Sequence, residues 1–262
     1  MSVEMISSRQ NSLVKQLKKL GESKRARAEA GQVLAEGIHL VRTQIEAGVY
    51  PELLVVAQRV ADHAEIQLLR ACCDDARWVI LANDIFDQIA PTDSPAGVLS
   101  LSALPNSDVS ANTLLDTLVL DNVQDPGNVG SLIRTAVAAG VKQIVLSEGC
   151  ADAWSPRCLR AGQGAQWLAR IYKDQDLLTW LNQYQGAIAA TVLDDAQSLY
   201  ALKLDEPTAW LFGNEGQGVR QELVACATQR VTIPMPGGME SLNVNAAAAV
   251  CLFEQVRQRL NA

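Results

Sequence analysis

Two segments in the last third of the chain decide the fold: Leu211-Phe212-Gly213-Asn214-Glu215-Gly216-Gln217-Gly218 and Ile233-Pro234-Met235-Pro236-Gly237-Gly238-Met239-Glu240-Ser241-Leu242-Asn243-Val244-Asn245. Each reads as a short apolar strand, then a glycine-rich turn with small polar groups, then the start of a helix. Glycine lets another group approach bare backbone, so both turns have the composition of a ligand site. An upstream segment, Asp125-Pro126-Gly127-Asn128-Val129-Gly130-Ser131-Leu132-Ile133-Arg134, also leads from a strand into a helix.

Strands alternate with helices throughout the part of the chain beyond residue 113. We expect strands at 118–120, 143–146, 187–192, 209–212 and 230–233, and helices near 130–140, 155–165, 175–184, 218–227 and 242–260. Alternation of this kind predicts an α/β domain with a mainly parallel sheet and helices on both faces.

The first hundred residues predict a smaller, separate α/β domain. We expect a polar helix at 11–29, a strand at 33–37, a helix at 38–47, a buried strand at 53–56, further elements at 66–71, 78–81 and 85–89, and a last strand at 96–101. The turn-rich segment from Ser102 to Thr113 then reads as a linker. The expected domains are therefore residues 1–104 and 113–262.

Composition narrows the class of protein further. No run approaches the roughly 18 to 20 apolar residues of a membrane span, and the N-terminus has no signal-peptide core, so we expect a cytoplasmic protein without a membrane partner. The six cysteines include no Cys-x-x-Cys pair, which favours reduced thiols over a disulfide framework. With His39 and His63 as the only histidines, no metal site is expected.

The charge is distributed unevenly along the chain. The net charge is −7, yet seven basic residues and a single acid lie between Arg9 and Arg27, which leaves −13 on the rest of the chain. We call six of these residues the basic stripe: Lys15, Lys18, Lys19, Lys24, Arg25 and Arg27. A local positive surface on an acidic protein suits contact with RNA phosphates, although a solvated helix face explains the same pattern.

In order and internal spacing, the three glycine-rich segments resemble the signature motifs of the SpoU (TrmH-like) RNA ribose 2'-O-methyltransferases of the SPOUT superfamily. We call Asp125–Arg134, Leu211–Gly218 and Ile233–Asn245 the first, second and third motif. The resemblance spans about residues 113–260. Val33 to Glu46 and Thr92 to Val98 also resemble the ribosomal-protein-like RNA-binding domain that precedes many SpoU catalytic domains.

The resemblance implies S-adenosylmethionine (AdoMet) as cofactor, structured RNA as partner and a deep C-terminal trefoil knot. The helix at 242–260 is too apolar for a free surface and is expected to pack in a homodimer. The apolar positions on which this expectation depends are Val244, Ala248, Cys251, Leu252, Val256 and Leu260.

The resemblance also implies roles for single residues. The catalytic set would be Asn128, Arg134, Glu215, Ser241 and Asn243, and the cofactor would lie against Gly213, Ile233 and Leu242. A guanidinium is effectively never deprotonated, so Arg134 would act as a cation at the 2'-hydroxyl, oriented by Glu215. Asn245 stands where many relatives have serine and is left outside the catalytic set.

Ordinary structural roles compete with each of these assignments. Asn128, Ser241 and Asn243 could cap helices, Arg134 could form a surface ion pair, and Glu215 could be a charge favoured near a helix N-terminus.

For the whole chain, the predicted function is AdoMet-dependent 2'-O-methylation of a ribose in structured RNA. A separate RNA-binding domain favours 23S rRNA over tRNA. The alternatives are a catalytically inactive RNA-binding relative and a nicotinamide-dependent α/β enzyme, although Gly127-x-x-Gly130 lacks the dinucleotide-binding spacing.

Overall fold

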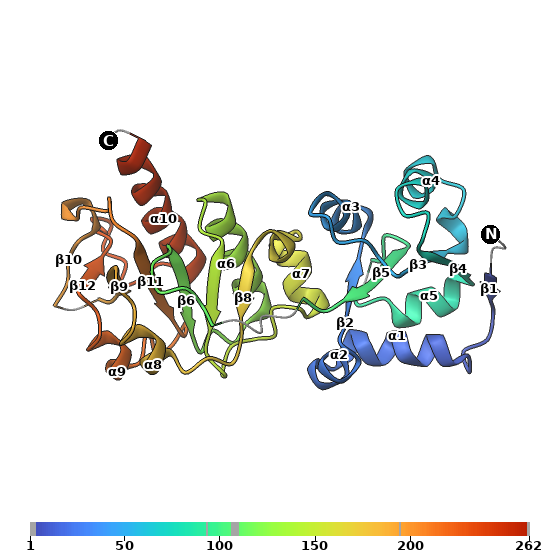
Figure 1. The fold of residues 1–262 in the computed structure, drawn as a ribbon, viewed down its shortest axis with the longest axis horizontal. Coiled ribbons are helices and arrows are strands. Elements are labelled where there is room, and N and C mark those ends of the chain that lie inside the picture. The colour runs from blue at the N-terminus through green and yellow to red at the C-terminus, as the bar shows by residue number, and fades with distance from the viewer. Residues whose placement is uncertain (1–3, 93, 106–109, 194, 261–262) are drawn as a thin grey trace. The chain divides into compact units, whose positions relative to one another are not determined.

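The computed structural model describes residues 4–260 except 93, 106–109 and 194. The chain folds into two compact units (Figure 1). One runs to Asn106 and includes Trp154–Trp167, whereas the other comprises Ser107–Ala153 and the chain from Leu168 onward. The centre of the expected linker, at 106–109, lies outside the described residues, and the domain limits 1–104 and 113–262 stay a prediction.

The first unit is built on a five-stranded sheet with the order β1-β4-β3-β5-β2. The strands are β1 (Glu4–Ile6), β2 (Gln32–Glu36), β3 (Leu53–Ala57), β4 (Arg77–Leu81) and β5 (Val98–Ala103). β5 is antiparallel to β2 and β3, whereas β1, β4 and β3 run parallel to one another. The edge strand β1 was not predicted, because three residues carry no readable alternation.

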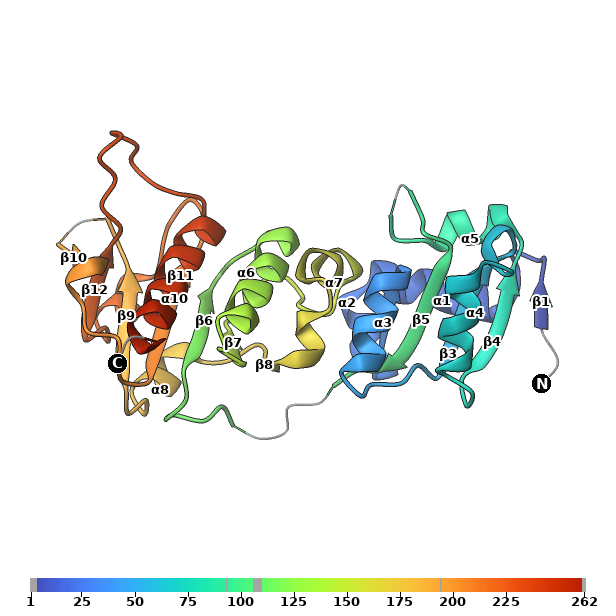
Figure 2. The ribbon, with the colours of Figure 1, turned by 90° about the horizontal axis from the view of Figure 1, so that it is seen from above.

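Helices cover both faces of this first sheet (Figure 2). The helices of this unit are α1 (Ser12–Glu22), α2 (Lys24–Ala30), α3 (Ile38–Glu46), α4 (Ala64–Ala71), α5 (Asn83–Ile89) and, from the later segment, α7 (Pro156–Gly162). Short 3₁₀ turns span Gln58–Val60 in the first unit, Ala165–Leu168 where the chain passes from the first unit to the second, and Leu199–Ala201 in the second unit. Apolar residues of α1 and α5 pack on one face of the sheet, and those of α3 and α4 on the other.

The single polar helix expected at 11–29 is wrong in two respects. First, the helix is broken at Ser23. The backbone N–H of Ser23 donates to Lys19 O, which ends α1, and the Ser23 hydroxyl accepts from Ala26 N at 3.1 Å, which caps α2. Second, α1 is amphipathic rather than polar all round. Its buried stripe comprises Leu13, Val14, Leu17 and Leu20.

The second unit is built on a seven-stranded sheet with the order β10-β12-β9-β11-β6-β7-β8, in which every neighbouring pair is parallel. The strands are β6 (Thr117–Asp121), β7 (Gln143–Leu146), β8 (Arg170–Tyr172), β9 (Ala187–Thr191), β10 (Gln197–Ser198), β11 (Thr208–Gly213) and β12 (Gln229–Thr232). The predicted fold class, a mainly parallel α/β sheet, is thus confirmed. The trefoil knot stays a prediction.

Two pairs of helices sandwich this second sheet. α6 (Pro126–Ala138) and α10 (Val244–Leu260) pack side by side on one face (Figure 1), and α8 (Leu177–Leu181) and α9 (Gln221–Val224) lie on the other. Strand residues alternate between the two faces. Trp210 and Phe212 stack 6.4 Å apart on the α10 side, whereas Ala209 and Leu211 belong to the cluster on the α8 side.

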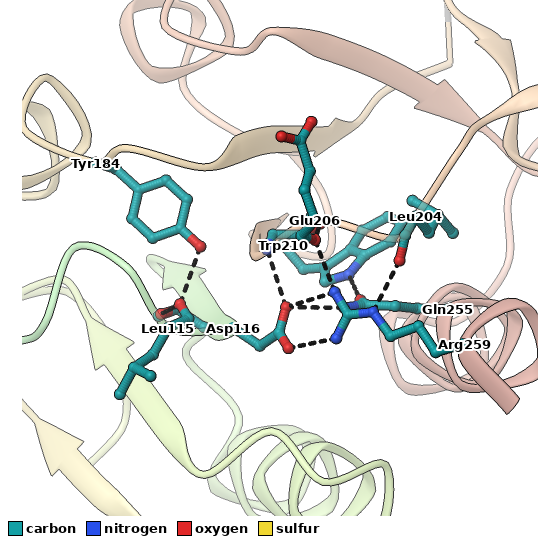
Figure 3. A network of polar contacts seen from close by, with 10 residues as sticks. Leu115, Asp116, Tyr184, Leu204, Glu206, Trp210, Gln255 and Arg259 are labelled. Atoms are coloured by element: carbon teal, nitrogen blue, oxygen red, sulfur yellow. Dashed lines mark hydrogen bonds and ion pairs between the residues drawn. The ribbon is translucent and has the colours of Figure 1, made fainter. Parts of the chain in front are cut away.

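A network of hydrogen bonds joins the C-terminal half of α10 to Asp116, which directly precedes β6 (Figure 3). Asp116 accepts hydrogen bonds from Arg259 Nη1 at 2.5 Å, from Gln255 Nε2 at 2.8 Å and from the backbone N–H of Thr208 at 2.9 Å. Gln255 in turn accepts from the buried indole N–H of Trp210. α10 is therefore held by directional bonds as well as by apolar packing.

No helix in the described ranges is both long enough and apolar enough to cross a membrane. The six cysteines are present as thiols, and four of them, Cys73, Cys150, Cys158 and Cys251, are buried. Burial raises the pKa of Cys251 to about 12, so this thiol stays protonated at neutral pH.

Candidate active site

The three motifs meet at one edge of the second sheet. Parallel strands place their carboxyl ends on the same edge, and ligands of open α/β sheets bind there. The first motif follows β6, the second ends β11, and the third follows β12. β6 and β11 are neighbours in register, with Asp121 opposite Gly213.

The loop of the second motif is a closed turn organised by Asn214. The side-chain oxygen of Asn214 accepts from Gly216 N at 2.9 Å and Gln217 N at 3.1 Å, and its backbone exchanges two hydrogen bonds with Gly218. Its side-chain NH₂ donates to Asn122 O at 3.0 Å. Asn122 has a positive φ of 55°, a conformation that non-glycine residues rarely adopt except at functional sites or turns.

Gly213 is required by this turn itself. A Cβ atom at Gly213 would lie 2.1 Å from the backbone carbon of Gly218 and 2.2 Å from Val219 N. Any side chain at residue 213 would therefore force the loop open.

An ion pair anchors the far end of the same loop. Asp121 is 1% exposed, and its carboxylate accepts from both the backbone N–H of Arg220 at 2.9 Å and the Arg220 Nε at 2.8 Å. Asn214 anchors the start of the loop and Arg220 its end, so Glu215 lies between two hydrogen-bonded anchor residues.

The first motif opens α6 and points Asn128 toward the second motif. Asp125, rather than Asn128, caps the helix, because its carboxylate accepts from the backbone N–H of Asn128 at 2.9 Å, and Pro126 occupies the first turn. The side chain of Asn128 is thus free of the capping role. Its NH₂ group donates to Glu215 Oε1 at 2.6 Å.

The third motif adds Asn245, which the sequence analysis left outside the site. Asn245 Nδ2 donates to Asn128 Oδ1 at 2.6 Å. Asn243 takes a structural role, since its side chain accepts from Asn245 N at 2.9 Å at the start of α10. Residues from all three motifs are therefore joined by one chain of hydrogen bonds, from Asn245 through Asn128 to Glu215.

Arg134 is exposed on α6, and its side chain has no hydrogen bond or ion pair to any residue that the structure describes. The expected contact with Glu215 is not formed, because Glu215 Oε1 accepts from Asn128 instead. The other carboxylate oxygen, Oε2, makes no bond within the described ranges. It remains available to a guanidinium or to a substrate.

The loop between β12 and α10 combines apolar side chains with exposed glycine backbone. It stands clear of the sheet in Figure 2 and exposes apolar side chains, with Met239 70% and Leu242 41% exposed, while Ile233 is half-buried. Gly237 and Gly238 present bare backbone, with no atom within 4 Å of the place a Cβ would take. Apolar side chains beside open backbone fit AdoMet. Ser241 is exposed and no hydrogen bond brings it to Asn128 or Glu215 among the described residues.

The basic stripe lies on α1 and α2 of the first unit and is only partly available. Lys15, Lys18, Lys19 and Lys24 are exposed, and Arg25, also exposed, pairs with Glu29 at 2.6 Å. Arg27 is 4% exposed and donates to Leu20 O at 2.6 Å, so the expectation that it contacts phosphate is wrong. Its guanidinium instead ties α2 to the end of α1.

Sequence reasoning missed five residues that shape the site: Asp121, Asn122, Asn214, Arg220 and Asn245. The polar pair Asp121-Asn122 at the end of an apolar strand was a readable signal, because ligands of open α/β sheets bind at the carboxyl ends of the strands. The contact of Asp121 with Arg220 joins positions 99 residues apart, and no spacing rule could have indicated it.

Comparison with known proteins places the chain among RNA methyltransferases. Residues 116–253 match the SpoU rRNA Methylase family, and residues 11–100 match the MRM3-like substrate binding domain. The chain is 32% identical to an uncharacterised tRNA/rRNA methyltransferase of Synechocystis, covering 98% of this chain and 95% of the relative. It is 30% identical to the 23S rRNA (guanosine(2553)-2'-O)-methyltransferase RlmP of Bacillus subtilis, covering 96% and 98%.

Solved structures agree with these matches. The crystal structure of an AdoMet-bound rRNA methyltransferase from Sinorhizobium meliloti superposes with a TM-score of 0.82 at 27% identity. The match covers 97% of this chain and 98% of that one, so both units have counterparts there.

Proposed function

The chain belongs to the SpoU rRNA methylase family, and on that premise we propose that it transfers the methyl group of AdoMet to the 2'-hydroxyl of one ribose in 23S rRNA. The observation that carries the proposal is the 2.6 Å hydrogen bond between Asn128 and Glu215. It joins the first and second motifs, 87 residues apart, at the ligand-binding edge of a parallel sheet.

Two findings favour 23S rRNA over tRNA as the substrate. RlmP, a relative over nearly the whole chain, acts on 23S rRNA, and the first unit matches a substrate-binding domain. A dedicated binding unit suits recognition of folded RNA, which is read by shape over a wide surface.

The cofactor site that we propose uses apolar side chains and backbone. Ile233 and Leu242 would frame the adenine and its ribose, and the backbone at Gly213 would close the site from the second motif. When bound, AdoMet supplies an electrophilic methyl group on a sulfonium. The residues around it must hold that group in line with the ribose oxygen, which is mainly a matter of orientation.

We assign catalysis to the side chains of the first motif and Glu215. Arg134 carries a permanent positive charge, so it would stabilise the negative charge that develops on the ribose oxygen as the 2'-hydroxyl gives its proton to solvent water. Glu215 Oε2 would orient Arg134 once RNA is bound. Asn128, Ser241 and the NH₂ group of Asn243, whose side-chain oxygen closes the first turn of α10, would position the ribose.

The same proposal extends to partners. The four exposed lysines of the basic stripe would contact RNA phosphates, the protein would act as a homodimer through α10, and the reaction would take place in the cytoplasm.

Calorimetry and an in vitro transfer assay test the proposed function. We expect AdoMet to bind and NAD not to bind, and we expect radiolabelled methyl groups to enter unmodified 23S rRNA at a ribose. AdoMet binding without transfer to any RNA would identify an inactive RNA-binding relative, and NAD binding would favour a nicotinamide-dependent enzyme.

A further inference from the structure

The three side chains that link the motifs form a line of two hydrogen bonds, and both bonds are donated in the same direction, from Asn245 toward Glu215. Asn245 Nδ2 lies 2.6 Å from Asn128 Oδ1, and Asn128 Nδ2 lies 2.6 Å from Glu215 Oε1. The residues come from the start of α10, the start of α6 and the loop after β11, so the bonds join segments that are far apart in the sequence.

The direction of this line follows from the chemistry of its end. An ionised carboxylate can only accept hydrogen bonds, so Asn128 must turn its NH₂ group toward Glu215. The carbonyl oxygen of Asn128 then faces Asn245, and only a donor there can satisfy it. If Asn245 presented an acceptor, Asn128 would lose one bond or rotate its amide away from Glu215.

The side chain of Asn245 also lowers the stability of the fold in a way that a packing role alone does not explain. The other end of the Asn245 side chain, Oδ1, is buried and accepts no hydrogen bond from the described residues. An unsatisfied buried acceptor destabilises a fold, and such groups in folded proteins call for an explanation. A side chain needed only to fill space would avoid that cost, which indicates that the donor end of Asn245 is what matters.

We propose that Asn245 is a positioning residue of the methyl-transfer site, which donates to Asn128 Oδ1 and so holds the Asn128 NH₂ group on Glu215. Through this bond the third motif sets the orientation of Asn128 and the carboxylate plane of Glu215 before RNA binds. The inference rests on the proposed function for its effect on catalysis, but its geometry stands independently. A serine at residue 245 would also present a hydrogen-bond donor.

Three variants of the full chain separate a donor from a space-filling group. Asn245→Ser keeps a donor but is smaller, Asn245→Asp keeps the shape but presents a carboxylate, and Asn245→Ala removes both. We expect Asn245→Ser to retain kcat within about threefold, and the other two to lower kcat by about 10- to 100-fold with KM for AdoMet nearly unchanged, because misorientation acts mainly on the reacting geometry. A purely packing role predicts the opposite order for Asn245→Ser and Asn245→Asp.

A double-mutant cycle supplies the control. In the Asn128→Ala background, Asn245→Ala should have no further effect on kcat, because residues that act as a unit are not additive. Full additivity would overturn the proposal, as would an Asn245→Ala variant with normal kcat or an Asn245→Ser variant as slow as Asn245→Ala.

A spectroscopic measurement keeps this test distinct from the test of the proposed function. The side-chain NH₂ signals of Asn128, identified by their loss in Asn128→Asp, should shift in Asn245→Ala and Asn245→Asp and stay near their positions in Asn245→Ser. If the native protein methylates no RNA but these shifts occur, the proposed function fails and the positioning bond stands. If native activity is present and the signals do not move in any variant, the positioning role fails alone.

Discussion

Arg134 lies six residues beyond Asn128 on α6, about 9 Å farther along the helix axis, and is exposed and unpaired among the described residues. An exposed guanidinium without a partner is available to bind a substrate, which agrees with a role that begins only when RNA is bound. We predict that Arg134→Ala lowers kcat by about 100- to 1000-fold, which is the usual effect of removing one donor that stabilises charge in the transition state. AdoMet affinity, measured by calorimetry, should change little.

Arg134→Lys is the matched variant for this prediction. It should be nearly as damaging, since an ammonium keeps the charge but lacks the planar fork that can hold a carboxylate and a ribose oxygen together. Near-normal turnover of either variant would remove Arg134 from the mechanism.

Gly213 is the residue at which backbone geometry is most restrictive. We predict that Gly213→Ala lowers the free energy of unfolding by about 1–3 kcal/mol, as overpacking does, and abolishes AdoMet binding, because the new Cβ would meet Gly218 backbone at 2.1 Å. Gly237→Ala is the control for stability, since its Cβ would meet no atom within 4 Å. Equal thermal stability of the two variants would contradict the account of this loop.

At the residue scale, the motif pattern predicted Asn128 and Glu215 as site members, and the structure joins them by a hydrogen bond. The pattern could not give the partner of each side chain. Asn243 and Asn245 stand two residues apart at one helix start, and only the geometry of the first turn of α10 decides that Asn245 faces Asn128 while Asn243 closes the turn.

α10 presents two different faces. The expectation that Ala248, Cys251 and Leu252 serve a homodimer is not met as stated, because all three are buried within the chain itself, on the face that packs toward α6. A second apolar stripe at three- and four-residue spacing remains at least partly exposed. It comprises Ala246, Ala249, Phe253, Val256 and Leu260.

We predict that the protein is a homodimer held by this second stripe. Phe253 is 47% exposed, and Phe253→Lys should convert the dimer to a monomer at micromolar concentration, as measured by light scattering. Leu68→Lys on α4 is the control, since Leu68 is 64% exposed on the other unit and should leave the mass unchanged. A monomeric native protein would rule out the interface.

The network at the end of α10 predicts a pH-dependent contribution to stability. Burial raises the pKa of the Asp116 carboxyl, but hydrogen bonds from Arg259, Thr208 and Gln255 and the charge of Arg259 outweigh it and hold the pKa below its usual value. A depressed pKa in the folded state stabilises the protein above the unfolded pKa of about 4, and this stabilisation is lost as the pH falls through the folded pKa.

Asp116→Asn should therefore lower the free energy of unfolding by about 1.5–3 kcal/mol at pH 7, the usual range for hydrogen bonds to charged groups. The difference from the native protein should shrink in acid, as measured by denaturant unfolding. Asp195→Asn, which removes an ion pair to Arg230 with the Asp195 side chain 88% exposed, should have little effect at either pH. A constant difference for Asp116→Asn across that range would contradict the assignment.

At the element scale, long apolar runs such as 53–56 and 209–212 were sufficient to predict strands β3 and β11. β10 has only two residues and β8 only three, too few for a pattern to register. The break between α1 and α2 was missed although the sequence carries two signals for it: Gly21 disfavours helix, and Ser23 is a common N-cap residue.

At the scale of the whole molecule, the two units divide recognition from chemistry in our proposal. Removal of the first unit would be a poor test, because Trp154–Trp167 groups with that unit and would lose its packing partners. Substitution of exposed lysines in the full chain avoids this problem.

We predict that replacing Lys15, Lys18 and Lys19 together by glutamine weakens RNA binding without affecting AdoMet affinity. Each phosphate contact removed should lower the slope of log affinity against log salt by about 0.7 to 0.9. Replacing Lys142, Lys173 and Lys203 on the second unit by glutamine is the control, because it changes the net charge by the same amount without touching the basic stripe. Unchanged affinity and slope would make the stripe a solvated helix face.

The central claim, ribose methylation of 23S rRNA, is tested most directly by mapping 2'-O-methylation across the total RNA of a deletion strain. We predict that one ribose methyl group of 23S rRNA is lost, returns on complementation with the native gene, and does not return with Arg134→Ala. An identical methylation map in the deletion strain and its parent, or loss of a methyl group from tRNA alone, would contradict the account.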